Sequence, residues 1–96
     1  MAARGRFLHV GFMWKGTPKV TELEPVFNHA LDWARYAANC WILWTTTEPD
    51  VWLERIRPHL GVDDNVVIAE LALGTSPTNY TGWAGKWLWE WIKKPR

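Results

Sequence analysis

Hydrophobic residues gather in short runs along the chain, and their spacing predicts strands. The run over residues 6–14 is apolar on both faces, which is typical of a strand in the middle of a sheet. One face carries Leu8, Val10, Phe12 and Trp14, and the other carries Phe7, His9, Gly11 and Met13. Residues 40–46 and 66–73 are also rich in β-forming side chains, and the latter run is apolar on both faces except at Glu70.

Residues 33–37 permit two interpretations. If Ala38 and Asn39 form a tight turn, these residues are a short strand that pairs with residues 40–46 in a hairpin. Helix propensity favours the alternative, in which a preceding helix continues as far as Ala38.

Two segments before residue 62 follow the 3.6-residue period of a helix. In the first, Thr21 and Glu24 match a capping box, although Pro25 then falls one residue beyond the first turn. Its apolar stripe consists of Leu23, Val26, Phe27, Ala30, Leu31 and Ala34. The second helix begins near Pro49 and ends before Gly61. Its stripe consists of Trp52, Leu53, Ile56 and Leu60.

Residues 83–94 alternate in part like a strand, but Lys93 and Lys94 favour the C-terminus of a helix. As a helix, this segment places five apolar residues on one face and Trp89 on the other. The five are Trp83, Trp87, Leu88, Trp91 and Ile92. Residues 74–81 read as the loop that leads into it.

With the hairpin, the order of elements is strand, helix, strand, strand, helix, strand and an added C-terminal helix. This order is that of a ferredoxin-like βαββαβ fold of the α+β class, in which two helices cover one face of an antiparallel sheet. A chain of 96 residues provides for one such domain, residues 1–96. The second face of the sheet then needs another cover.

Composition narrows the classes of protein. Apolar residues make up 48% and charged residues 22%, which excludes a disordered tail, and a net charge of +1 excludes a strongly basic nucleic-acid binder. No apolar run is long enough to span a membrane, and His9, Lys15 and Gly16 interrupt the N-terminal one, so we expect no signal peptide. The single cysteine, Cys40, excludes an intrachain disulfide and favours a cytoplasmic protein.

Tryptophan is the unusual component, since the chain has nine. Such large side chains cannot all fit in the core of so small a domain. Some must therefore lie at an interface, in a groove or on the surface.

Five stretches are similar to short bacterial proteins labelled the SinR family: 40–45, 56–60, 64–71, 82–84 and 89–94. The resemblance covers most of the chain from about Thr21 onward. It implies a ferredoxin-like domain akin to VapD ribonucleases and to the small CRISPR-associated subunit of the spacer-acquisition complex, and it favours the hairpin. Those relatives are dimers that pair through their sheets. The kinship points to bacterial defence or mobile elements, including a phage or plasmid inhibitor that binds a defence complex.

The chain departs from these relatives at the end of the first strand. There the relatives have a Tyr-Asp pair whose Asp is the candidate metal ligand, whereas the equivalent positions here are Gly11 and Phe12. Phenylalanine offers a divalent metal no oxygen. We therefore expect no catalytic residue and a protein that is not an enzyme. Residues 74–81 also form a longer link into the last helix than is usual in the family.

The remaining carboxylates and metal-ligating residues form no recognisable site. The carboxylates open to a metal-dependent nuclease are Asp32, Asp50, Asp63, Asp64 and Glu70, the last on a predicted central strand. The side chains that zinc prefers, namely Cys40, His9, His29 and His59, lack the close pairs of a zinc site. No phosphate loop or dinucleotide fingerprint is present in the sequence, so we expect no metal and no cofactor.

The surplus of aromatic residues and the two-sided sheet indicate a non-enzymatic interaction module that forms a homodimer and binds a protein partner, without a membrane. The expected contact residues are Phe7, Met13, Trp41, Leu43, Trp83, Trp87 and Trp91. One alternative is a dimeric metal-dependent endonuclease. The other is a passive nucleic-acid binder that uses basic residues near both ends of the chain. Those residues are Arg4, Arg6, Lys86, Lys93 and Lys94.

Overall fold

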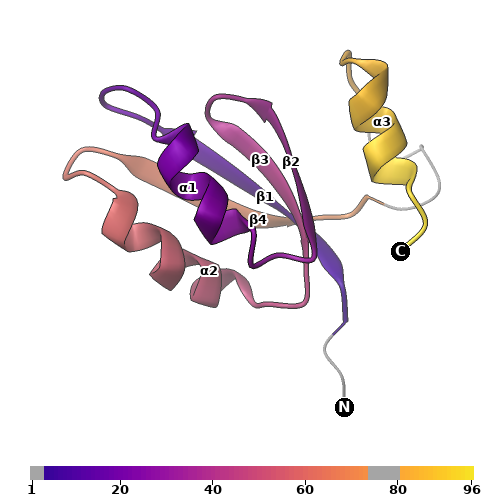
Figure 1. Cartoon of the computed structure of the whole chain (residues 1–96), viewed down its shortest axis with the longest axis horizontal. Helices are drawn as coiled ribbons and strands as arrows, with labels where there is room; N and C mark the ends of the chain where they lie inside the picture. The colour runs from indigo at the N-terminus through magenta and orange to yellow at the C-terminus, as the bar shows by residue number, and fades with distance from the viewer. Residues whose placement is uncertain (1–3, 74–80) are drawn as a thin grey trace.

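A computed structural model describes residues 4–73 and 81–96 (Figure 1). Its elements are β1 (Arg6–Met13), α1 (Val20–Phe27), β2 (Asp32–Ala37), β3 (Cys40–Thr45), α2 (Pro49–Ile56), the 3₁₀ turn η1 (Arg57–His59), β4 (Asn65–Leu71) and α3 (Lys86–Lys93). The predicted loop over residues 74–81 lies, apart from Thr81, outside the described residues.

The strands form one antiparallel sheet in the order β2-β3-β1-β4. Strand β1 lies in the interior of the sheet, as its two apolar faces predicted. The hairpin of β2 and β3 is confirmed, and the alternative of one long helix is wrong. The α+β class is confirmed within the described residues by this sheet and three helices, and the order is compatible with a ferredoxin-like plan.

Strand β4 lies at the edge of the sheet, because it pairs only with β1 among the described strands. The prediction that Glu70 stands on a central strand was therefore wrong. Apolar residues on both faces of β4 do not require a central position, because only one face is covered: Val66 and Ile68 pack on the main core, whereas Val67 and Ala69 are exposed.

The first face of the sheet packs against α1 and α2 and holds the main core (Figure 1). The core residues are Leu8, Val10, Phe12, Leu23, Phe27, Trp41, Leu43, Trp52 and Ile56. Register explains the set, because Leu8 pairs with Leu43 and Val10 pairs with Trp41, and partners across an antiparallel pair share a face. The predicted division of β1 into two faces is confirmed.

Helix α1 is shorter than its stripe predicted. It ends at Phe27, and Leu31 N donates to Trp44 O as the chain turns into β2. Ala30, Leu31 and Ala34 therefore lie outside the helix. The predicted capping box is also wrong, since Lys19 occupies the N-cap without a side-chain hydrogen bond.

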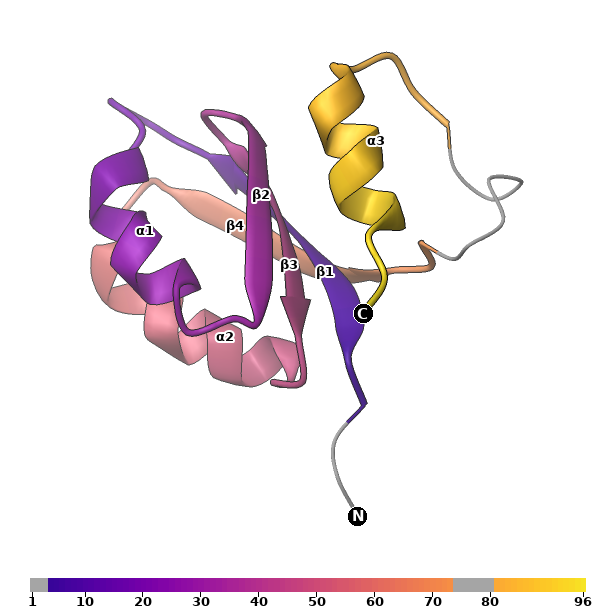
Figure 2. The same ribbon diagram turned by 45° about the vertical axis from the view of Figure 1, so that its right-hand side comes forward.

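Helix α3 lies on the opposite face of the sheet from α1 and α2, as Figure 2 shows. Its buried residues, Leu88 and Ile92, cover Phe7, Ala34 and Ile42 with help from Trp89 and Trp91. The predicted stripe was wrong in part: Trp83 and Trp87 are exposed, and Trp89 faces the sheet.

Candidate functional site

Helix α3 covers only one end of the second face of the sheet, and the other end is open. Beside the polar residue Asn65, which pairs with Met13, this open end has seven other strand residues that we call the open half-face. They are His9, Gly11, Met13, Tyr36, Cys40, Val67 and Ala69. Pairing places them together, because Gly11 stands between Cys40 on β3 and Val67 on β4.

The open half-face exposes apolar side chains and carries no formal charge. Met13 is 62% exposed and Val67 is 58% exposed, although both are large hydrophobic residues. None of its seven residues is Asp, Glu, Lys or Arg. Exposed apolar residues that form one contiguous patch are uncommon on soluble monomers, so their clustering on a sheet indicates a contact surface.

A hydrogen-bonded row of side chains crosses the open half-face. His9 Nε2 lies 2.6 Å from the Tyr36 hydroxyl, and the hydroxyl also interacts with the Cys40 thiol. Burial, together with the hydrogen bond to Cys40, raises the pKa of Tyr36 to about 12. The phenol therefore stays neutral, and the row fixes the shape of the patch without adding charge.

The absence of a side chain at Gly11 leaves space for the His9 ring. A Cβ atom at Gly11 would come within 3.1 Å of His9 Cε1. Tyr36 reaches the same ring because β2 shifts register between Arg35 and Ala37, which inserts one extra residue on that strand.

Acidification should destabilise the fold through His9. Burial disfavours the imidazolium and lowers the pKa of His9 below 6.5. The unfolded chain therefore takes up this proton at a higher pH than the folded chain does. The contribution of neutral His9 is complete above pH 6.5 and is lost as the pH falls through the lowered pKa.

Urea unfolding of the wild type and of His9→Gln at neutral and mildly acidic pH measures this contribution. We expect the wild type to lose more stability on acidification than His9→Gln, whereas the exposed His29→Gln control should follow the wild type. Equal losses for the wild type and His9→Gln would contradict the assignment.

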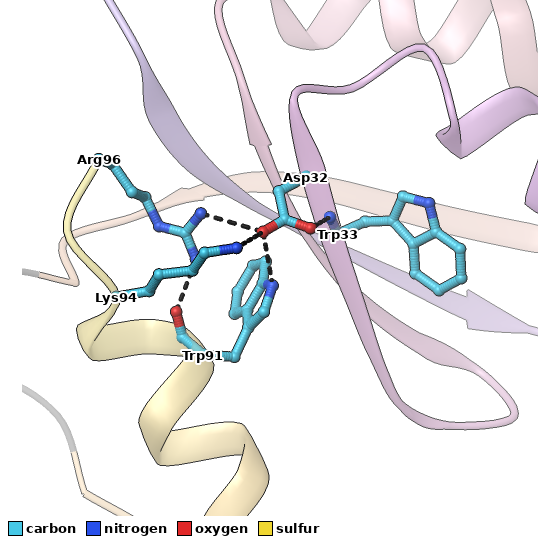
Figure 3. Close-up of polar contacts among 5 residues, drawn as sticks. All are labelled: Asp32, Trp33, Trp91, Lys94 and Arg96. Carbon is cyan, nitrogen blue, oxygen red and sulfur yellow. Dashed lines mark hydrogen bonds and ion pairs between the residues drawn. The ribbon is translucent and has the colours of Figure 1, made fainter.

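The covered half of the face is closed by a cluster of polar contacts around Asp32 (Figure 3). Asp32 Oδ2 accepts from Trp91 Nε1 at 3.0 Å, Arg96 Nη1 at 3.2 Å and Lys94 Nζ at 3.4 Å. Its other oxygen accepts from the N–H of Trp33 at 2.9 Å. One carboxylate on β2 thus holds both α3 and the segment after it.

The environment of Asp32 keeps it ionised. Partial burial by itself would raise the pKa of this carboxyl, but the hydrogen bonds from Arg96 and from the Trp33 N–H, together with the charge of Lys94, lower it overall. At neutral pH the three donors therefore face a full negative charge.

The structure separates the predicted contact residues. Met13 lies on the open half-face, and Trp83 and Trp87 are exposed near α3. Trp41 and Leu43 are fully buried under α1 and α2, so their assignment to a contact surface was wrong. The reason is register: Trp41 pairs with Val10, which faces the main core, and not with a residue on the opposite face of β1, such as Phe7 or Met13.

Phe7 and Trp91 belong to the covered half of the face. Phe7 is buried beneath α3, and Trp91 packs against the same cluster with its indole N–H on Asp32. Their prediction as free contact area was wrong, because α3 supplies the cover that was expected from another molecule.

The contact residues predicted from the sequence did not include His9, Tyr36, Val67 and Ala69. Two of these had a signal: Val67 and Ala69 alternate with Val66 and Ile68 along one strand, as the two faces of β4 require. No signal in the sequence indicated the contact of His9 with Tyr36, since this contact depends on the irregular register of β2.

The predicted nucleic-acid residues come together only in part. Arg4 and Arg6 line an open hollow of about 650 Å³, which shares Phe7, Trp44 and Leu73 with a second hollow of about 540 Å³ beside Lys93 and Lys94. Arg6 is paired with Glu48 and Glu70. Lys94 is paired with Asp32, and Lys86, at the other end of α3, with Glu90.

The candidate carboxylates have local roles. Asp64 accepts from the backbone N–H groups of Lys15 and Gly61, which lower its pKa, and Asp50 accepts from Val51 N. Over residues 4–73 and 81–96, no three side chains of His, Cys, Asp or Glu are grouped so that they could hold a metal ion.

Comparison of the chain with protein-family models, with curated proteins and with solved structures gave no match. The resemblance to the SinR-labelled proteins therefore stays a prediction. In the part of the chain that the structure describes, no helix has the length and apolar character needed to cross a bilayer.

Proposed function

We propose that this chain is a small non-enzymatic interaction module of ferredoxin-like plan, which forms a homodimer through the open half-face. The observation that carries the proposal is a patch of exposed apolar residues, with no formal charge, on a sheet whose opposite face is packed. Burying such a patch against a second apolar surface is favourable by about 25 cal/mol for each Å² removed from water.

A second copy of the chain fits this surface on electrostatic grounds. A charged partner would gain nothing from a patch that has no charge to complement. Two copies of the patch meet without like-charge repulsion, and a two-fold axis places the same residues on both sides. Edge strand β4 adjoins the patch and, with Glu70 as its one formal charge, lacks the lysines and prolines that protect many edges.

The dimer should be weak. A standard interface involves roughly 20–30 residues on each side, and the open half-face contributes seven. We therefore expect a dimer that dissociates on dilution and exchanges with a protein partner. The setting of bacterial defence or mobile elements rests on the resemblance alone.

Placing a lysine on the patch tests the proposal. In Val67→Lys, two cations would face each other across the interface, so we expect self-association to weaken about tenfold or more. Sedimentation across a concentration series measures this change. Val62→Lys is the matched control, because Val62 is fully exposed in the turn before β4 and lies off the patch.

Both variants should unfold within about 0.5 kcal/mol of the wild type, since the substituted side chains are exposed. A wild-type chain that stays monomeric at every concentration would overturn the homodimer. Equal dimerisation of the two variants would place the contact elsewhere.

A further inference from the structure

We propose that Asp32 and the rings of Phe7, Trp44 and Trp91 form a binding site for a guanidinium group. Within the chain, Arg96 fills this site. In trans, the site binds an arginine-bearing segment of a partner protein, which displaces residues 94–96 while α3 stays in place. The inference concerns the covered half of the sheet and does not depend on the proposed dimer.

The Arg96 side chain is held as a ligand would be. Its central carbon lies 4.5 Å from the centre of the Trp91 ring, 5.3 Å from Phe7 and 5.5 Å from Trp44. Its two terminal nitrogens donate to Asp32 Oδ2 at 3.2 Å and to Trp91 O at 2.6 Å. The side chain is only 9% exposed. Carboxylate, carbonyl and aromatic faces are together the groups that recognise a guanidinium.

The site selects arginine over lysine by shape. A planar guanidinium can stack on the rings while its separate N–H groups reach an oxygen on each side, whereas an ammonium is a compact, more strongly hydrated charge. Lys94 illustrates the difference within the chain, since its Nζ reaches Asp32 at 3.4 Å, with a side chain that is 60% exposed.

The segment that fills the site leaves room for a competitor. Helix α3 ends at Lys93, and residues 93–96 form part of the wall of the open hollow of about 540 Å³ over Phe7 and Trp44. Arg96 is thus held by its own side-chain contacts beyond the end of the helix. Removing the Arg96 side chain leaves three rings beside the Asp32 carboxylate, which Lys94 contacts from its exposed position, and such a combination can take a guanidinium.

The test vacates the site and offers the ligand separately. The Arg96→Ala chain is titrated with N-acetyl-Pro-Arg-amide and, as matched probe, N-acetyl-Pro-Lys-amide, and the indole N–H resonance of Trp91 is followed by NMR. We expect saturable binding of the arginine probe with a Kd of roughly 1 mM. The lysine probe should bind about tenfold more weakly.

Two further titrations define the site. Asp32→Asn in the Arg96→Ala background should weaken the binding of both probes, because the carboxylate that pairs with either cation is gone. The wild type should bind the arginine probe about tenfold more weakly than Arg96→Ala, since its own Arg96 competes at a high effective concentration.

Arg96→Gln repeats the titration with less disturbance of the fold, because an amide can still donate to Trp91 O. If both vacated variants keep the tertiary circular dichroism of the wild type and neither binds arginine selectively, the proposal is wrong. Val67→Lys should bind the arginine probe as the wild type does. Failure of the proposed dimer can therefore be distinguished from failure of the proposed arginine site.

Discussion

Replacing Trp41 by alanine will lower the free energy of unfolding by about 3–5 kcal/mol. Trp41 is fully buried between the sheet and α1, where its ring centre lies 4.5 Å from that of Phe27 and 5.0 Å from that of Trp33. The substitution leaves a cavity that these aromatic neighbours cannot close. Chemical denaturation measures the loss, and each kcal/mol should also lower Tm by roughly 4–8 °C in a chain of this size.

Trp87→Ala is the matched control, because Trp87 is 52% exposed on α3. Its free energy of unfolding should stay within about 0.5 kcal/mol of the wild type. If Trp41→Ala were as mild as Trp87→Ala, Trp41 would not be a core residue. If Trp41→Ala instead weakened self-association while the fold kept its stability, the contact surface would have to include it.

Trp41→Phe should cost much less than Trp41→Ala. The indole N–H of Trp41 is buried and has no hydrogen-bond partner among the described residues, so losing it removes a donor that is already unsatisfied. Trp52 gives the contrast, because its Nε1 donates to Thr45 Oγ1 at 3.3 Å.

Much of the fold could be predicted from short-range pattern. The alternation of β1 identified both of its faces, and the run from Cys40 identified β3, because both signals depend only on neighbours in the sequence. The face assignment of Trp41 failed, because it depends on how β3 pairs with β1, and a shift of one residue exchanges the faces.

The contacts that close the second face could not be predicted at all. Asp32 and Arg96 are 64 positions apart, and a single aspartate at the start of a strand has no pattern that indicates a distant arginine. The tryptophan surplus was a correct indication that a second apolar layer exists. It could not distinguish a layer supplied by α3 from one supplied by another molecule.

The second large effect should come from Asp32→Ala, which will release α3 from the sheet. The carboxylate accepts from Trp91, Lys94 and Arg96, and hydrogen bonds to a charged group are each worth about 1.5–3 kcal/mol before screening by solvent. Because the Asp32 side chain is 31% exposed, we expect a total loss of about 2 kcal/mol. Hydrogen exchange of the α3 amides measures the release, and Asp63→Ala, at an exposed aspartate in the turn before β4, is the control.

The pH dependence identifies the carboxylate as the cause. The pKa of Asp32 is lowered in the folded chain, so its contribution is complete above the ordinary value of 3.8 and is lost as the pH falls through the lowered pKa. The difference in stability between the wild type and Asp32→Ala should therefore stay constant near neutrality and shrink in acid. A difference that persists unchanged in acid would show that packing, and not charge, is responsible.

Release of α3 has a consequence for association. The cover over Phe7, Ala34 and Ile42 would be lost, and these residues continue the open half-face along the same strands. The apolar area available to a second copy would then grow, so Asp32→Ala should dimerise more strongly than the wild type. Adding Val67→Lys should reverse the gain if both halves of the face act as one surface. If the stronger dimerisation of Asp32→Ala persisted with Val67→Lys, the half of the face that α3 normally covers would associate by itself.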